Sequence, residues 1–258
     1  MDLHIKKLRV LITAGAAGIG LEIARAFLRE GARVHICDVD REALAALRST
    51  DPEITQSLCD VSDRTQVKNL FAEALQALGG LDCLVNNAGV AGPTGRVEEI
   101  NPEDWDRCLA IDLTGQFNCA RLAIPHLKES ANPSLLNLSS QAGKHGFPLR
   151  SPYAAAKWGV IGFTKTIAIE LGEFNIRVNA LLPGIVAGDR IRRVFEAKAQ
   201  QRGVSVAEME TIMFAHTSIK EYVTPQQIAD QIVFMASPRG RTISGQAIAI
   251  CGDTRMLG

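Results

Sequence analysis

The sequence has few of the features that mark nucleic-acid-binding or membrane proteins. Aromatic residues make up 5% of the 258 residues, and no basic tract is interleaved with them. Lysine plus arginine and aspartate plus glutamate balance at 28 each. The longest apolar runs are broken by glycine, arginine or aspartate well short of a membrane span. We therefore expect no nucleic-acid partner and no membrane partner.

Patterns for metal binding and disulfides are also absent. The six cysteines are scattered with no Cys-x-x-Cys pair, and the five histidines show no metal-ligand spacing. Most of the cysteines lie within apolar runs, so we expect free buried thiols in a reducing compartment and no metal site. The N-terminal segment has no apolar stretch ahead of a cleavage site, which predicts a cytoplasmic protein.

What the chain does contain is a long alternation of apolar strand runs and amphipathic helices. Strands are expected at 9–13, 33–38, 54–59, 81–85, 134–138, 176–181 and 247–250, and helices at 18–31, 41–48, 63–78, 101–128 and 153–171, with a further one capped by Thr224. The helix that begins at Asn101-Pro102 is expected to run towards Lys128 and to bend near Pro125. The alternation predicts an α/β fold with one doubly wound Rossmann-type domain, residues 1–258, and a central parallel sheet with helices on both faces.

A glycine-rich turn, Thr13 to Gly20, follows the first strand. Its small residues let a backbone approach a pyrophosphate, and the helix that follows supplies free N–H groups. The standard Gly-x-Gly-x-x-Gly pattern is absent, and glycine also makes tight turns for structural reasons. The place of the turn, between a strand and an amphipathic helix, favours a dinucleotide site.

The second strand ends at Asp38, twenty residues after Gly18. A carboxylate at that point accepts hydrogen bonds from the adenosine ribose hydroxyls and repels a 2′-phosphate. No arginine or lysine lies in the glycine turn to offset this repulsion, and Arg41 is the nearest basic residue. The sequence therefore predicts NAD as the cofactor, in preference to NADP.

Tyr153 and Lys157 lie four residues apart, with Ser140 thirteen residues upstream of the tyrosine. On a helix this spacing stacks the phenol and the ammonium about 5–6 Å apart at their Cβ atoms. A neighbouring cation favours the phenolate form, and a serine hydroxyl can hold a substrate oxygen. Together the three residues can move a proton to or from an alcohol or carbonyl. The tyrosine–lysine pair alone is also common on helix surfaces, where it has no catalytic role.

Five segments, in this order and spacing, resemble the classical short-chain dehydrogenase/reductase family over essentially the whole chain. They are Thr13-Ala14-x-x-x-Gly18-x-Gly20, Asp60-Val61, Asn86-Asn87-Ala88-Gly89, the set Ser140, Tyr153 and Lys157, and Pro183-Gly184-Ile185-Val186. The resemblance implies a cofactor site formed by Thr13, Gly15, Ala17, Gly18, Ile19, Asp38, Asp60, Val61, Asn87, Ala88, Gly89, Tyr153, Lys157, Pro183, Gly184 and Val186. It also implies a homotetramer built on the long helices and the C-terminal strand.

In this family the tyrosine is the acid–base group, the serine orients the substrate oxygen and the lysine binds the nicotinamide ribose, so the resemblance assigns these roles to Tyr153, Ser140 and Lys157. Asp112 stands where the family has a catalytic asparagine. We expect Asp112 to preserve a local break in its helix and to place a carboxylate within reach of Lys157; the alternative is a purely structural residue. Gly188 replaces a threonine that contacts the nicotinamide amide, which leaves this contact to the backbone near Val186.

The residues that would contact the substrate lie outside the motifs named above. We expect residues 187–220 to form a helical lid, and most of its charged side chains to lie in solvent. His145, Arg150 and Arg190 are the candidates for contacts with an anionic or polyhydroxylated substrate. The prediction is an NAD-dependent oxidoreductase that interconverts the secondary alcohol and the carbonyl of a small sugar, polyol or hydroxy acid. An NADP-dependent 3-oxoacyl thioester reductase and a non-catalytic nucleotide sensor on the same scaffold remain as alternatives.

Overall fold

The computed structural model describes residues 2–257, so Met1 and Gly258, the two ends of the expected domain, lie outside the described residues. One parallel sheet has the strand order β3-β2-β1-β4-β5-β6-β7. Its strands are β1 Arg9–Thr13, β2 Arg33–Asp38, β3 Thr55–Leu58, β4 Cys83–Asn86, β5 Ser134–Leu138, β6 Arg177–Pro183 and β7 Ala247–Ile250. The order reverses between β1 and β4, which confirms the doubly wound α/β fold.

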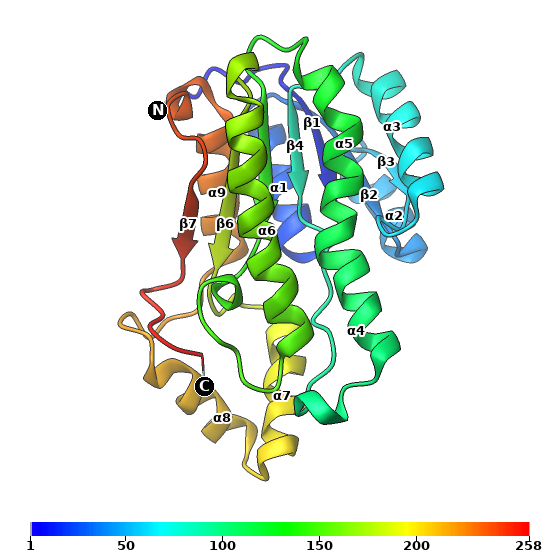
Figure 1. Ribbon diagram of the computed structural model, residues 1–258. Coiled ribbons are helices and arrows are strands. Elements are labelled where there is room, and N and C mark those ends of the chain that lie inside the picture. The colour runs from blue at the N-terminus through cyan, green and yellow to red at the C-terminus, as the bar shows by residue number, and fades with distance from the viewer. Residues whose placement is uncertain (1, 258) are drawn as a thin grey trace.

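Helices cover both faces of this sheet (Figure 1). The helices α1 Gly18–Arg29, α2 Arg41–Thr50 and α9 Pro225–Ala236 share one apolar cluster, and α3 Arg64–Leu78, α5 Gly115–Leu127 and α6 Ser151–Glu170 share a second cluster. Neighbouring residues of β1 point into different clusters, since Val10 and Ile12 belong to the first and Leu11 to the second. This is the period of two that a strand buried on both faces requires.

The helix expected from Asn101 to Lys128 is not continuous. Helix α4 spans Pro102–Leu109, a π-helical segment η2 covers Ala110–Thr114, and α5 begins at Gly115. Asn101 caps α4 as predicted, because its side chain accepts a hydrogen bond from the Glu103 N–H at 3.1 Å. Pro125 lies inside α5, and the α-helical pattern is interrupted around Asp112; the bend near Pro125 stays a prediction.

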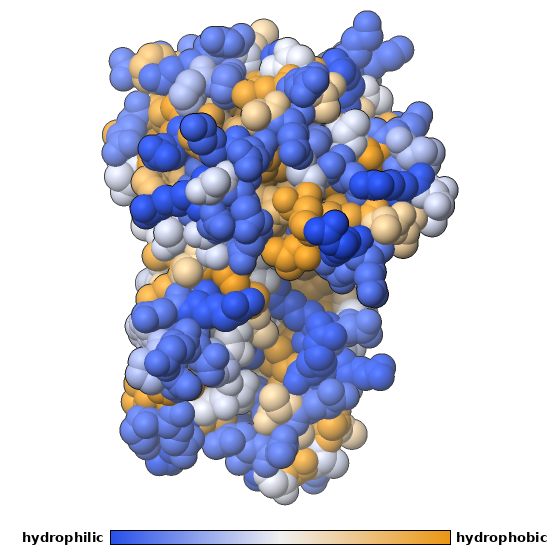
Figure 2. All heavy atoms as spheres, turned by 90° about the vertical axis from the view of Figure 1, so that its right-hand side faces the viewer, coloured by the Kyte–Doolittle hydropathy of each residue, from blue (hydrophilic) through white to orange (hydrophobic). Residues whose placement is uncertain are grey.

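Two further helices, α7 Asp189–Arg202 and α8 Val206–Ala215, lie beyond the carboxyl ends of the strands (Figure 1). They enclose a third apolar cluster that contains Phe195, Met209 and Met213. The C-terminal residues attach to the chain just after α8, where the Ile219 N–H donates to the Gly252 carbonyl at 2.9 Å. Figure 2 shows the surface hollowed between the body around the sheet and this smaller part.

Short 3₁₀ segments complete the described chain: η1 Val97–Glu99, η3 Gln141–Gly143, η4 Gly172–Phe174 and η5 Pro238–Gly240. Within residues 2–257 no helix is both long and apolar enough to cross a membrane. The same range contains no group of three histidine, cysteine or acidic side chains that could hold a metal ion. The six cysteines are free thiols and five of them are buried, as the sequence predicted.

Candidate active site

The turn after β1 leaves the start of α1 open. Ala17 precedes α1 and makes no side-chain cap, so the first N–H groups of the helix have no side-chain acceptor. Gly18 has a φ of +53°, in the region that favours glycine, whereas Ala14 adopts nearly the same φ, +52°, with a Cβ atom. A left-handed alanine costs about 1 kcal/mol. Gly20 admits no side chain, because a Cβ atom there would lie 2.0 Å from the Ala14 carbonyl oxygen.

Hydrogen bonds join this turn to the loop after β4. The Thr13 hydroxyl accepts from the backbone N–H groups of Asn87 and Ala88 at 3.0 and 2.9 Å. The Asn87 amide donates to the carbonyls of Thr13 and Ala14 at 3.0 and 2.9 Å. Thr13 is buried, so its side chain holds the two turns together beneath the expected cofactor site.

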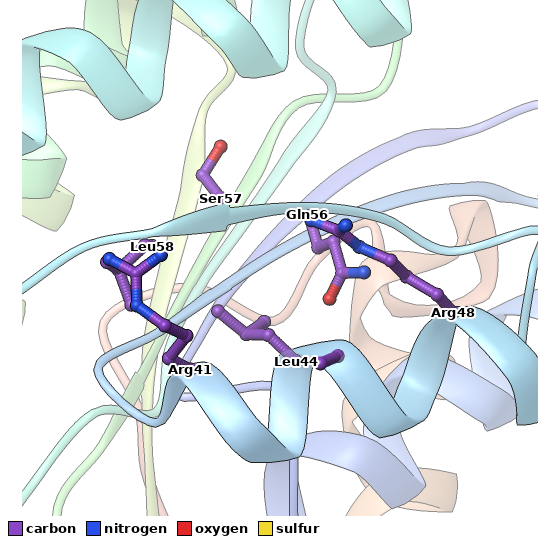
Figure 3. Close-up of a pocket in the computed structure, with 7 residues that line it drawn as sticks. Arg41, Leu44, Arg48, Gln56, Ser57 and Leu58 are labelled. Atoms are coloured by element: carbon purple, nitrogen blue, oxygen red, sulfur yellow. The ribbon is translucent and has the colours of Figure 1, made fainter.

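Asp38 is held at the end of β2 by backbone donors. Its carboxylate oxygens accept from the Ala16 N–H at 3.0 Å and from the Asp40 N–H at 3.1 Å. The next residue, Val39, is 64% exposed and apolar, so it offers no cation to a 2′-phosphate. Arg41 lines a hollow of about 160 Å³ between α2 and β3, at the Leu58 end of that hollow (Figure 3). Arg41, the basic residue closest to Asp38 in sequence, is itself exposed.

The remaining expected cofactor residues lie in loops at the same edge of the sheet. Asp60 accepts from the Ser62 N–H at 2.9 Å and so closes the turn after β3, and buried Val61 packs against Gly115. At the end of β6, Gly184 donates its N–H to the Ile250 carbonyl at 2.9 Å, directly after Pro183. The open helix start, the fixed Asp38 carboxylate and these loops fit a dinucleotide laid across the β1–β4 crevice.

Tyr153 and Lys157 lie in the first turns of α6, and Ser140 follows β5. The Lys157 Nζ atom lies 5.5 Å from the centroid of the Tyr153 ring and donates to the Leu138 carbonyl at 3.1 Å. Ser140 caps the short helix η3, where its hydroxyl accepts from the Ala142 N–H at 3.1 Å, and η3 packs against α6. The structure thus brings the predicted serine, tyrosine and lysine to the carboxyl end of β5.

Asp112 forms a buried ion pair with Lys157. The distance from Lys157 Nζ to the Asp112 Oδ2 atom is 3.1 Å, and the Asp112 side chain is fully buried. The other carboxylate oxygen accepts from the Val90 N–H at 2.6 Å. Gly89 leaves room for the pair, since a Cβ atom there would lie 3.2 Å from Lys157 Nζ. The expected helix break and the expected reach from Asp112 to Lys157 are both confirmed.

A buried polar network supports these elements, and sequence reasoning missed it. Asn86 of β4 donates to Asn137 of β5 at 2.9 Å, and Asn137 donates to the Thr164 hydroxyl of α6 at 2.9 Å. Gln116 of α5 donates to the Leu138 carbonyl at 3.0 Å, the carbonyl that Lys157 also uses. Amide side chains inside apolar strand runs, as at Asn86 and Asn137, were the available signal.

Two of the three predicted substrate residues lie at the Tyr153 ring. The Arg150 and Arg190 guanidinium groups lie 5.1 and 5.9 Å from the ring centroid. Arg150 is 2% exposed, its terminal nitrogen donates to the Ala91 carbonyl, and its Nε atom is buried without a hydrogen-bond partner. Arg190 is exposed and donates to the Gly89 carbonyl at 3.1 Å.

His145 and Lys198 lie farther from the centre of the site. No hydrogen bond or ring contact joins His145 to Tyr153 among the described residues, and the His145 Nε2 atom is buried without a partner. Lys198 is an exception to the expectation that most charges of the lid lie in solvent, because its side chain is fully buried and its Nζ atom lies 4.1 Å from the centroid of the Phe147 ring. Burial, aided by the charges of Arg202 and Arg150, lowers the pKa of Lys198 to about 7.

Comparisons with known proteins agree with this geometry. A family model described as enoyl-(acyl carrier protein) reductase matches residues 14–252. The 3-oxoacyl-(acyl-carrier-protein) reductase FabG of Thermotoga maritima is 35% identical over 246 residues, which cover 94% of this chain and 95% of the relative. D-beta-hydroxybutyrate dehydrogenase of Cupriavidus necator is 33% identical over 241 residues, 91% of this chain and 93% of the relative.

Among solved structures, an actinorhodin polyketide ketoreductase variant with NADPH matches with a TM-score of 0.88 and 32% identity, over 95% of this chain and 96% of that chain. The match to the family model contains the glycine turn from Ala14, the strands β2 to β7 and the segment with Ser140, Tyr153 and Lys157. The chain therefore belongs to the classical short-chain dehydrogenase/reductase family of nicotinamide-dependent oxidoreductases.

Proposed function

We propose that this protein is an NAD-dependent dehydrogenase that interconverts the secondary alcohol and the ketone of a small hydroxy acid. One observation carries the proposal: Tyr153, Lys157 and Ser140 meet at the carboxyl end of β5, on the same edge of the sheet as Asp38 and the open start of α1. Proton-transfer groups and a ribose-binding carboxylate on one edge are what alcohol oxidation with NAD requires.

In alcohol oxidation, the ionised Tyr153 accepts the hydroxyl proton while the carbon loses its hydride. The bound nicotinamide supplies the hydride acceptor. Ser140 donates to the substrate oxygen and keeps it next to the phenol. Lys157 presents its ammonium to the ribose and to Tyr153, and the Leu138 carbonyl and Asp112 hold that ammonium in place.

Two observations favour a hydroxy acid over a sugar or polyol. The Tyr153 ring is flanked by Arg150 and Arg190, and neither guanidinium pairs with a carboxylate of the described residues. An anionic substrate would supply the missing counter-charge. The relative from Cupriavidus necator is, by its name, a dehydrogenase of such an acid.

A second candidate, an NADP-dependent reductase of 3-oxoacyl thioesters, is favoured by the Thermotoga maritima relative and by the NADPH in the structural neighbour. Asp38 and the apolar Val39 argue against it, because they place a negative charge and no cation where the 2′-phosphate would lie. The cofactor preference of the purified protein separates the two candidates.

A panel of hydroxy acids, polyols and sugars, followed by nicotinamide absorbance with NAD and with NADP, tests the proposal. We expect the fastest turnover with a hydroxy acid and NAD. Faster oxidation of NADPH with a 3-oxoacyl thioester would establish the second candidate. Nucleotide binding without turnover of any alcohol or ketone would favour the non-catalytic alternative, a nucleotide sensor.

The assembly that we propose is a homotetramer built on α5 and α6 and on the edge strand β7. Large apolar side chains lie exposed on these helices: Phe117 is 43%, Trp158 52% and Ile169 83% exposed. We predict a tetramer by light scattering at micromolar concentration, and a shift towards smaller species in the Trp158→Glu variant. A monomeric wild-type protein would contradict this assembly.

A further inference from the structure

The centre of the site carries an unusual arrangement of charges. The Asp112 carboxylate lies 3.1 Å from the Lys157 ammonium in a fully buried position. Because opposite charges at this distance largely cancel at longer range, Lys157 acts on Tyr153 as one end of a neutral pair. The attraction that a lone lysine exerts on a neighbouring phenolate is therefore reduced here.

Two other cations face the same ring. Arg150, from the loop before α6, and Arg190, from α7, lie 5.1 and 5.9 Å from the centroid of Tyr153, on a par with the 5.5 Å of Lys157. Neither arginine forms an ion pair in the part of the chain that the structure describes. Cys108 of α4 also lies close to this site, but burial raises its pKa to about 11, so it is a neutral thiol at physiological pH.

Arg150 is the more buried of these two arginines. It is 2% exposed and its Nε atom has no hydrogen-bond partner. Burial lowers the pKa of Arg150, and the negative charge of an ionised Tyr153 is the largest effect that opposes this shift. At 5.1 Å from the ring centroid, the guanidinium of Arg150 in turn attracts negative charge on Tyr153.

We propose that Arg150, assisted by Arg190, supplies the positive field that favours the Tyr153 phenolate, in place of the charge of Lys157 that Asp112 offsets. Arg150 is then a positioning residue for proton transfer as well as a candidate substrate contact. The inference rests on the acid–base role of Tyr153 in the proposed function. Its test is the ionisation of this tyrosine in the protein without substrate.

The absorbance measurement is easy to interpret, because the chain contains two tyrosines. The second, Tyr222, has its pKa raised to about 12 by burial and by its hydrogen bond to Glu210, and Tyr222→Phe removes it from the spectrum. In this background the ultraviolet absorbance of tyrosinate, followed against pH, reports Tyr153 alone. Circular dichroism at each pH verifies that the fold persists.

We expect Arg150→Met to move the midpoint of this transition up by about one pH unit, and Asp112→Asn to move it down by a similar amount. The double variant returns close to the starting value if the two charges act independently. Arg150→Lys keeps the charge, so the midpoint in this variant should stay within about 0.3 pH units of the midpoint in the parent. Arg48→Met removes an equal charge on α2 and leaves the midpoint unchanged.

An unchanged midpoint in Arg150→Met, or an equal shift in Arg150→Lys, would overturn the proposal, since the effect would then be absent or due to shape. If Arg150→Met does not fold, the exposed Arg190→Met carries the test, with an expected upward shift of about half a pH unit. These outcomes do not depend on turnover. A dehydrogenase of another substrate class would leave them intact, and loss of the midpoint shift would leave the proposed function intact.

Discussion

The half of the site that is expected to hold the nucleotide and the half that is expected to hold the substrate are built in different ways. In the nucleotide half, the polar groups of Thr13, Asp38 and Asn87 bind the backbone of neighbouring turns. In the substrate half, Arg150 and His145 keep buried nitrogen atoms without hydrogen-bond partners, and Lys198 is buried among apolar side chains. The first half is fixed by backbone hydrogen bonds around an open helix start, whereas the second holds positive charge around the Tyr153 ring.

The two kinds of specificity therefore have different origins. A nucleotide site built from backbone donors and small residues depends on the path of the chain, which the fold fixes. A substrate site built around a buried cation such as Arg150 depends on a few side chains, and a bound anion would offset the desolvation of that cation. Substitutions in each half test this difference separately.

Tyr153→Phe removes the phenol and keeps the packing of the ring. We expect turnover to fall by about two to four orders of magnitude, as for the loss of a general base, with NAD affinity unchanged. Steady-state kinetics and a nucleotide titration measure the two halves separately. Near-normal turnover would place the chemistry elsewhere, and a parallel loss of NAD binding would mean that the halves are not separate.

Asp38→Ala combined with Val39→Arg should change the nucleotide half alone. Each charge-assisted hydrogen bond to a ribose hydroxyl contributes about 1.5–3 kcal/mol, so the preference for NAD over NADP should fall by at least about tenfold. The kcat/KM values for the two cofactors, at one saturating substrate, give the ratio. Asp38→Asn is the matched control, because it removes the charge and retains an acceptor for the Ala16 N–H. A wild-type protein that already prefers NADP would contradict the role of Asp38.

Lys198→Met should change how the stability of the substrate half depends on pH. An unfolded lysine titrates near about 10.4, whereas burial lowers the pKa of Lys198 in the folded chain to about 7. Between these values the unfolded state binds more protons, so this residue makes stability rise with pH. The free energy of unfolding of the variant should therefore rise less between about pH 7 and about pH 10 than that of the parent.

Denaturant unfolding at several pH values measures this difference, and Lys68→Met, which removes an exposed lysine on α3, is its control. A difference between variant and parent that does not vary with pH would contradict the lowered pKa of Lys198.

Ala14→Gly should give the smallest effect, in the nucleotide half. Ala14 holds a φ of +52° that glycine adopts without a steric penalty, so the variant should gain about 0.5–1 kcal/mol in free energy of unfolding. Ala16→Gly is the control, because Ala16 has no positive φ and the same change there should destabilise. Loss of stability in both variants would mean that the turn is not strained at Ala14.

The contrast between the halves also explains what could be predicted from the sequence. The strands, the glycine turn and the pair of Tyr153 and Lys157 follow from local patterns, because periodicity and spacing along one element determine them. Burial of Lys198 and of Arg150 depends on which loops pack over them, and a lysine in a basic helix gives no local sign of that. The Asn86–Asn137 network was visible only as amides in apolar runs, and its partners come from four different elements.

The π-helical segment Ala110–Thr114 has a consequence for rotational phase. A residue added to a continuous α-helix would rotate everything after it by about 100°, but the wider π-helical turn takes up the extra residue, so α4 and α5 keep their relative orientation. Deleting a single residue from this segment would therefore restore a continuous α-helix without rotating α4 against α5. Both helices would survive, but the widened turn that holds the carboxylate of Asp112 against the ammonium of Lys157 would be lost. Such a deletion would change the charges at the centre of the site while leaving the fold in place.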